Sequence, residues 1–402
     1  MKSDLDRLMA ERGIGGLIVP MHELSHPSFR WITRAARVTR GYALHRPGHA
    51  TLLVYYPMER DEAAAAGLPA LSIHELGYSD IFRANPDPTL AYAELYDRML
   101  RRHGVEGEIL FGGEVPVHLY LEIAGHLAAR GWHMHRSGGE DVIQLARKRK
   151  EQWEIDAIAS VGERTEQVVD AIRGLLRSVD LRDGVAFHQG SPLRIGDLKM
   201  LVSSEISRLG MIEDHETILS QGRDAGIPHS RGNPEALVRA SVPLVIDIFP
   251  ADRTTGYFFD LTRTFCIGPV PDRLARLHEE VLTAFEMAAE TMRAGHKASE
   301  YQGLVCDFFE SRGHPTTRST PTTLEGYVHS LGHGVGLEVH ERPSFSLAES
   351  RSDVIEAGDV LTIEPGLYYP GEEIGVRIED TLFVREDGRV ETLCRSPRGL
   401  VP

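Results

Sequence analysis

One stretch of this chain reads Pro243-Leu-Val-Ile-Asp247-Ile-Phe-Pro250, then Ala251-Asp-Arg-Thr-Thr-Gly256, then Tyr257-Phe-Phe-Asp260-Leu-Thr-Arg-Thr-Phe265. Two apolar runs joined by a turn rich in Asp, Thr and Gly are typical of an antiparallel β-hairpin. If the turn is centred between positions 253 and 254, Asp247 and Asp260 lie opposite each other. The stretch therefore predicts two carboxylates on one face of a buried sheet.

The predicted pairing of Asp247 with Asp260 is electrostatically unfavourable by itself. Carboxylates on opposed strand residues, with Cβ atoms about 5 Å apart, repel each other. Each aspartate also lies among large apolar residues, where an unpaired charge is costly to bury. A cation between them relieves both effects, and solvent-facing strand residues are the alternative interpretation. Asp252 is a competing candidate, but its place in the turn is typical of Asp that stabilises local backbone geometry.

Three further motifs place a histidine or a glutamate among glycine or apolar residues. They read His329-Ser-Leu-Gly-His333-Gly-Val-Gly-Leu-Glu-Val-His340-Glu-Arg-Pro343, Val360-Leu-Thr-Ile-Glu364-Pro-Gly366 and Ile374-Gly-Val-Arg377-Ile-Glu379-Asp380. Glycines beside His333 let the backbone approach a site closely. Arg377 and Glu379 share one face of a strand, so the arginine could orient Glu379 or bind an anionic substrate group. Taken singly, such a histidine is usually structural and such a glutamate is usually a surface charge.

Taken together, four carboxylates and one imidazole form a mainly oxygen-donor set, which suits hard or borderline divalent metals. Carboxylates can also bridge two ions, which then polarise a substrate and generate hydroxide at neutral pH. The predicted metal site consists of Asp247, Asp260, His333, Glu364 and Glu379.

Amphipathic helices are predicted around these motifs. Apolar residues at helical spacing indicate helices over 155–172 and 274–292, and Ser299-Glu-Tyr-Gln302 has the pattern of a capping box at the start of another helix. The basic run Ala146-Arg-Lys-Arg-Lys-Glu-Gln152 is interpreted as a solvated hinge rather than a nucleic-acid contact. Strands are expected at 242–249, 257–266, 360–364 and 374–384.

Residues before the hinge have the pattern of a small α/β unit. Helices are expected at 3–12, 89–104 and 119–131, and strands at 16–20 and 49–56. Because this part groups no chemically suggestive side chains, we interpret it as a packing and oligomerisation domain. The predicted domains are residues 1–147 and 148–402.

Composition restricts the class of protein. The 402 residues, 42% hydrophobic and 26% charged, predict a globular chain of two or three domains. A net charge of -15 argues against nucleic-acid binding. Three scattered cysteines form no disulfide framework and no zinc motif, which favours a reducing compartment. Charged residues at the N-terminus and the lack of an apolar run of about 20 residues predict a cytoplasmic chain without a signal peptide or membrane span.

In this context the motifs resemble those of the pita-bread metallopeptidases, which include methionine aminopeptidase, aminopeptidase P, proline dipeptidase and the metal-free creatinase. The matching patterns are Gly-Tyr-x-x-Asp-x-Thr-Arg-Thr-Phe, Gly-His-Gly-Val-Gly-Leu-x-Val-His-Glu, Glu-Pro-Gly and Gly-Val-Arg-Ile-Glu-Asp. The resemblance covers about residues 150–395, and residues 1–145 resemble the N-terminal domain of the proline-specific and creatinase branches. It implies an α/β (α+β) chain, with a creatinase-like α/β domain followed by a pita-bread catalytic domain built on a curved antiparallel sheet.

The resemblance also implies a role for each site residue. Asp247 would chelate one metal, His333 and Glu364 the other, and Asp260 and Glu379 would bridge both. His229, in Ile227-Pro-His229-Ser, would lie beside the scissile bond, and His340 would contact the substrate carbonyl or the tetrahedral intermediate. Glu364 would shuttle a proton from a metal-bridging hydroxide to the leaving nitrogen. Substrate contacts are thus expected from His229, His340 and Arg377.

One departure from the family pattern lies within the hairpin. The family usually separates the two aspartates by eleven positions, whereas Asp247 and Asp260 are thirteen apart, with the two extra residues in 250–255. An even insertion preserves which face each side chain takes. Phe249 also replaces the usual glycine. These changes affect the pocket rather than the ligands.

The resemblance implies hydrolysis of Xaa-Pro bonds, with an Xaa-Pro dipeptidase (prolidase) as the favoured activity and aminopeptidase P acting on longer peptides as the alternative. Methionine aminopeptidase usually lacks such an N-terminal domain, while a creatinase-like enzyme or a non-catalytic binding module usually lacks metal ligands. Two divalent ions per subunit are expected, Mn²⁺ first and Zn²⁺ or Co²⁺ as alternatives. Proline-containing dipeptides or short peptides are the expected substrates, and a homodimer is the expected assembly.

Overall fold

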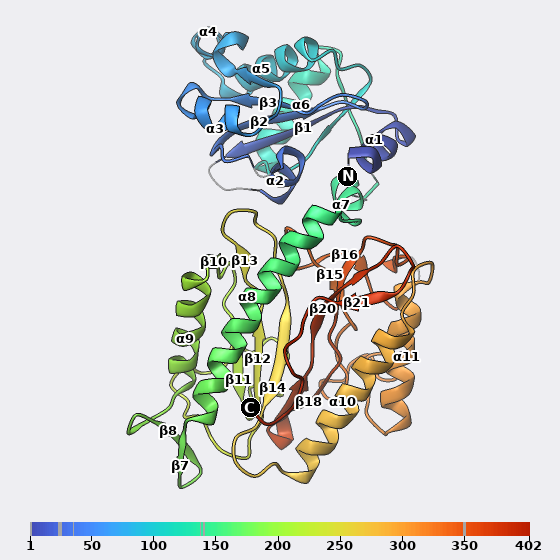
Figure 1. Cartoon of the computed structure of the whole chain (residues 1–402). Helices are drawn as coiled ribbons and strands as arrows, with labels where there is room; N and C mark the ends of the chain where they lie inside the picture. Colours follow the sequence, from blue (N-terminus) through green and yellow to red (C-terminus); the bar gives the residue numbers. More distant parts are fainter. Residues whose placement is uncertain (1, 23–25, 35, 137, 140, 349–350) are drawn as a thin grey trace. The chain divides into compact units, whose positions relative to one another are not determined.

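The computed structural model describes residues 2–22, 26–34, 36–136, 138–139, 141–348 and 351–402. The chain forms two compact units (Figure 1). The first comprises Met1–Arg147 with Thr254–Gly256, and the second comprises Lys148–Arg253 and Tyr257–Pro402.

The first unit is built on a six-stranded sheet in the order β4-β3-β2-β1-β5-β6. β1 pairs antiparallel with β2 and parallel with β5, so the sheet is mixed. The strands are β1 (Ile14–His22), β2 (Arg40–His45), β3 (Leu52–Tyr55), β4 (Ala70–Ser72), β5 (Glu108–Phe111) and β6 (His133–Met134). The helices are α1 (Lys2–Glu11), α2 (Pro27–Thr33), α3 (Arg60–Ala65), α4 (Tyr78–Ala84), α5 (Pro88–Arg102), α6 (Val117–Ala128) and α7 (Val142–Arg147).

The elements predicted for this unit are present with shifted ends. The strand expected at 49–56 starts only at Leu52, because a turn around Pro47 and Gly48 precedes it and Gly48 has a φ of +77°. The core of the unit includes Ile18, Leu44 and Leu95, all of them fully buried.

Helices flank the strands of the second unit. Figure 1 shows α8 (Gln152–Arg177) and α9 (Ile195–Arg208) at one flank, and α10 (Asp272–Thr291) and α11 (Ala298–Ser311) at the other. α8 buries the predicted apolar stripe, including Ile158, Val168 and Ile172. The cap of α11 differs from the prediction: the helix begins at Ala298, the Glu300 carboxylate accepts from the Lys297 N–H, and the Ser299 N–H donates to Ser352.

The strands of the second unit pair antiparallel in small sheets. One sheet has the order β11-β12-β14, another β16-β15-β17-β20-β21, and a third β18-β19. Their bounds are β11 (Ile218–Gln221), β12 (Leu244–Ile248), β14 (Leu261–Phe265), β15 (His333–Gly334), β16 (Glu341–Ser344), β17 (Val360–Ile363), β18 (Gly366–Tyr369), β19 (Ile374–Arg377), β20 (Asp380–Val384) and β21 (Val390–Thr392). Away from them lie β7 (Asp180–Arg182), β8 (Val185–His188) and β9 (Ser191–Pro192), and also β10 (Met211–Ile212) paired with β13 (Ala251–Asp252). The predicted mixed architecture, an α/β unit followed by a unit of antiparallel strands, is confirmed.

The predicted register of the hairpin is wrong by two residues. Asp247 pairs with Thr262 and Ile248 with Leu261, so Asp260 does not lie directly opposite Asp247. The ladder stops there because Pro250 has no N–H to continue it, and the chain instead forms β13 beside β10. A displacement of two residues leaves both aspartates on the same face of the sheet.

Two other predictions also need correction. The run expected as one strand at 374–384 is divided into β19, which pairs with β18, and β20, which pairs with β17. Glu379 lies at this division, where a bridge to Thr262 joins two sheets. The basic run is not a solvated hinge, since Lys148 and Lys150 are buried and paired with carboxylates.

Candidate metal centre

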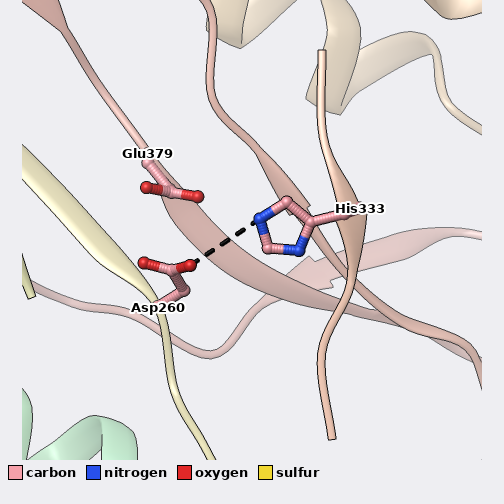
Figure 2. Close-up of side chains that lie close together, drawn as sticks. All are labelled: Asp260, His333 and Glu379. Carbon is pink, nitrogen blue, oxygen red and sulfur yellow. Dashed lines mark ion pairs between the residues drawn. The ribbon is translucent and has the colours of Figure 1, made fainter. Parts of the chain in front are cut away.

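Asp260 and Glu379 approach each other from different sheets. Asp260 lies just before β14, and Thr381 fixes its backbone by accepting its N–H and donating to its carbonyl, at 3.2 and 2.9 Å. The Glu379 backbone exchanges hydrogen bonds with Thr262, and its Oε2 accepts from the Thr262 hydroxyl at 2.6 Å. The bridge between Thr262 and Glu379 therefore brings the two buried carboxylates together (Figure 2).

His333 completes this group. One ligand atom from each of Asp260, His333 and Glu379 lies within 4.8 Å of the others. His333 Nε2 lies 3.7 Å from Asp260 Oδ2, as Figure 2 shows, and 3.6 Å from Glu364 Oε1. Its Nδ1 lies 3.1 Å from the carbonyl of Gly334. A proton on Nδ1 can donate to that carbonyl, which leaves the Nε2 lone pair directed at the carboxylates.

Glu364 and Asp247 lie at the borders of the group. Glu364 follows β17, and its N–H donates to the Leu331 carbonyl at 2.7 Å. Asp247, on β12, is buried and accepts from Arg377 Nη2 at 2.5 Å. Four of the five predicted ligands therefore lie close together: Asp260, His333 and Glu379, with Glu364 beside His333. The fifth, Asp247, interacts with them electrostatically, because its charge raises the pKa of the three other carboxyl groups.

Burial and mutual repulsion dominate the electrostatics of the site. Burial raises the pKa of Asp260 well above its usual range, and the charges of Glu379, Asp247 and Glu364 raise it further. Burial also raises the pKa of Glu379 well above its usual range, and the charges of Glu364 and Asp247 raise it further. Burial raises the pKa of Glu364 to about 8, and it lowers the pKa of His333 to about 3. The imidazole is therefore neutral, and the carboxylates need either protons or a cation beside them.

The donor atoms fit divalent metal. Among the described residues, Asp247 Oδ1, Asp260 Oδ1 and Glu379 Oε1 are buried and have no hydrogen-bond partner. Buried carboxylate oxygens are rarely left without partners. Together with the free lone pair of His333, they supply the oxygen-rich set with one nitrogen that borderline divalent ions accept.

Arg377 is buried and holds the Asp247 carboxylate in place. Besides Asp247, its guanidinium donates to the hydroxyls of Thr262 and Tyr368 and to the carbonyl of Pro228, at 3.2, 2.8 and 3.3 Å. Only 3% of the side chain is exposed. These contacts favour a role in holding Asp247 over the predicted direct contact with substrate.

The two histidines predicted to act on substrate lie at the exposed side of the group. The His340 ring packs edge-on against the His333 ring, with centroids 4.3 Å apart. His229 is exposed and close enough to lower the pKa of both His329 and His340. Both imidazoles are therefore accessible beside the carboxylates.

Sequence reasoning missed three residues around the centre. His329 Nδ1 lies 3.7 Å from Glu364 Oε2, and its Nε2 lies 2.9 Å from the Tyr368 hydroxyl. Tyr368 in turn accepts from Arg377, and Thr262 donates to Glu379. His329 is the first residue of the glycine-rich motif, so the sequence offered a signal for it. Tyr368 and Thr262 resemble ordinary strand residues.

Two other candidates lie outside this group. Asp252 accepts from Arg164 at 2.8 Å, so the preference for Asp247 over Asp252 agrees with the geometry. Phe249 is half-buried, with its ring centroid 6.5 Å from that of His215.

A unit of antiparallel strands that gathers three carboxylates around one imidazole, with Asp247 held at the border by Arg377 and an α/β unit before it, has the architecture of the proline-specific pita-bread metallopeptidases. The chain belongs to metallopeptidase family M24, whose model matches residues 156–386. This match confirms the resemblance described above.

Relatives and solved structures agree with the family. The Xaa-Pro dipeptidase of Pyrococcus furiosus is 33% identical over 186 residues, which are 46% of this chain and 49% of that protein. The match thus spans about half the length of this curated relative. The crystal structure of the prolidase from Pyrococcus horikoshii OT3 superimposes with a TM-score of 0.75 at 22% identity, covering 100% of this chain and 99% of that one. The X-Pro aminopeptidase from Thermotoga maritima MSB8 gives a TM-score of 0.74 at 21% identity, covering 100% and 99%. At these identities the structural likeness establishes the fold.

No helix within the described residues is both long and apolar enough to cross a membrane.

Proposed function

We propose that this chain is a dinuclear metallopeptidase that hydrolyses the Xaa-Pro bond. The observation that carries the proposal is the group of buried carboxylate oxygens without partners around the Nε2 of a neutral histidine. Asp247 would hold one ion, His333 and Glu364 the other, and Asp260 and Glu379 would contact both. Bound divalent ions supply polarisation of the scissile carbonyl and a lowered pKa of water.

The protein's own groups would handle the proton and the substrate. Glu364 would accept a proton and pass it to the leaving nitrogen. His340 and His229 would donate hydrogen bonds to the substrate carbonyl and to the negative charge that develops on it. Arg377 would keep Asp247 oriented through the short contact between them.

Among Xaa-Pro peptidases, we propose a dipeptidase, with aminopeptidase P activity on longer peptides as the alternative. A dipeptidase must accommodate a free prolyl carboxylate. Because Arg377 is buried and engaged with Asp247, a nearby histidine would be the better partner for this carboxylate. Phe249 and the two extra residues beyond it would narrow the path of a longer peptide.

The test compares kcat/KM for an Xaa-Pro dipeptide with that for an Xaa-Pro-Xaa tripeptide at one Mn²⁺ concentration. The dipeptidase proposal requires a clear preference for the dipeptide. Preference for the tripeptide would select aminopeptidase P, and hydrolysis of neither would reject both activities.

The assembly, metal and location are part of the same proposal. Mn²⁺ is the proposed ion, with Zn²⁺ or Co²⁺ as alternatives, and metal analysis of the purified protein distinguishes them. A homodimer is proposed, and light scattering that gives a mass of one chain would reject it. A cytoplasmic location is supported by Cys266, Cys306 and Cys394, which are buried free thiols.

A further inference from the structure

The basic run at the start of the second unit carries two lysines that are buried. Lys148 and Lys150 point the same way, while Arg149 between them is exposed, as expected for alternate residues of an extended segment. The segment is held by a bridge from Arg149 to Asp359 and by the Lys150 N–H, which donates to the Gly358 carbonyl at 2.8 Å. A buried lysine is costly unless its charge is paired.

The partner of Lys150 is Glu341. Their Nζ and Oε2 atoms are 3.0 Å apart, and the two side chains are only 1% and 4% exposed. Lys150 Nζ also donates to the Lys148 carbonyl at 3.2 Å. The Glu341 carboxylate is thus fixed from one side by a rigidly placed ammonium group.

The other side of the Glu341 carboxylate supports the turn that ends in His340. Its Oε1 accepts from the Glu338 N–H at 3.0 Å. It also packs against Gly336, where an added Cβ would lie 2.5 Å from Oε2. Glu338 and Gly336 belong to the turn between β15, which carries His333, and β16, which starts at Glu341.

We infer that Lys150 is a positioning residue that acts through Glu341 on His340. His340 is exposed and directly precedes Glu341, so the orientation of its ring against His333 depends on the backbone at Glu341 and on the turn that the carboxylate supports. Loss of the ammonium group would leave a buried carboxylate without its cation and let the turn relax. This role rests on the proposed function, because Lys150 would hold His340 in the orientation in which it contacts the substrate.

The kinetic test uses the Mn²⁺-loaded protein and an Xaa-Pro dipeptide. Lys150→Met should lower kcat roughly tenfold, since a small misplacement of a catalytic group has effects of this order or larger, while the metal content stays at the wild-type value. In a His340→Ala background, Lys150→Met should cause no further loss. The matched control is Lys148→Met, which removes a lysine that is also buried but is paired with Asp359 and Glu356 rather than with the turn. It should lower thermal stability and leave kcat unchanged.

A second readout does not depend on the substrate. The imidazole ¹³Cε1–¹H signal of His340, assigned by its loss in His340→Ala, should move in Lys150→Met and in Glu341→Gln, both loaded with Zn²⁺, and should stay in place in Lys148→Met. If Lys150→Met does not fold, Glu341→Gln replaces it in the kinetic test, because it keeps side-chain size and removes the charge. An unmoved His340 signal, or an equal kcat loss with and without His340, would overturn the inference. A moved signal in a protein that cleaves no Xaa-Pro peptide would instead reject the proposed function alone.

Discussion

Asp260 and Glu379 experience the strongest opposition between burial and charge in the described site. Both are almost fully buried, and burial raises the pKa of each. The charge of Glu379 raises the pKa of Asp260 further, and each of the two has one carboxylate oxygen without a partner. A neutral side chain of the same shape would remove the repulsion and also remove the negative charge that attracts a cation.

Asp260→Asn and Glu379→Gln should therefore each reduce bound metal from two ions to at most one and lower kcat/KM more than a hundredfold, since even residues that only support metal ligands contribute 10–100-fold. Metal analysis and dipeptide kinetics on the purified variants measure both effects. Asp252→Asn is the control, because Asp252 contacts Arg164 and lies outside the site. Two bound metals and full turnover in either variant would refute the assignment.

His229→Ala and His340→Ala should lower kcat by roughly a hundredfold, which is typical for loss of one hydrogen bond to developing charge. Metal content should be unchanged, because neither imidazole is a proposed ligand. His296→Ala is a suitable control, since His296 pairs with Glu300 at the surface. Release of metal from either variant would mean that the missing histidine is a ligand instead.

At the residue scale, the sequence singles out side chains that have both a reactive group and unusual neighbours along the chain. Asp247, Asp260 and His333 stand out among apolar or glycine neighbours. Tyr368 and Thr262 were not detectable, because their importance depends on contacts with Arg377 and Glu379 from other strands. The burial of Lys150 was hidden for the same reason, since Glu341 lies 191 positions away.

At the scale of elements, the helices were predicted closely and the strand registers were not. The apolar stripe of α8 repeats over many residues, so it fixes the helix and its buried face. The register of β12 and β14 depends on where the ladder stops, and Pro250 and the pairing of β13 with β10 decide that point. The site tolerated the error because a shift of two residues preserves the face.

Replacing Gly334 should test how closely the backbone packs where β15 meets β16. An added Cβ would lie 1.9 Å from the Arg342 carbonyl oxygen, so Gly334→Ala must displace backbone and should reduce stability by about 2 kcal/mol or more. Gly174→Ala in α8 is the matched control, because its Cβ meets no described atom within 4 Å and alanine favours a helix by roughly 0.5–1 kcal/mol. Urea unfolding of both variants gives the comparison, and equal midpoints would contradict the close packing of the turn.

At the scale of the whole molecule, the site should make the stability of the metal-free protein depend on pH. Between about pH 7.5 and 8.5 an unfolded chain has ionised carboxylates and largely neutral histidines. The folded metal-free protein still holds protons there, because the pKa of Glu364 is raised to about 8 and those of Asp260 and Glu379 are also raised. Stability therefore falls as pH rises through this window, by at most about 1.4 kcal/mol per pH unit for each proton lost.

Thermal melting of metal-stripped protein across this window checks the sign. The melting temperature should fall toward pH 8.5 without metal and fall less or rise with Mn²⁺, because metal binding displaces the protons. Glu364→Gln should flatten the metal-free curve. A melting temperature that rises from pH 7.5 to 8.5 without metal would contradict the raised carboxyl pKa values.

Length and the change of pattern near position 147 predicted two domains, at residues 1–147 and 148–402. The antiparallel second unit was accessible through its motifs, because they resemble those of a known family. Composition and periodicity could not predict that Glu379 lies beside Asp260. The two are brought together by the bridge between Thr262 and Glu379, which joins strands far apart in the sequence.

The most direct measurement is a Mn²⁺ titration of metal-stripped protein, followed by the rate of Xaa-Pro dipeptide hydrolysis. We predict no turnover without metal and a rate that saturates when two ions are bound per chain. Full turnover in the stripped protein, or saturation at a single ion with the second site never filled, would contradict the dinuclear centre formed by Asp247, Asp260, His333, Glu364 and Glu379.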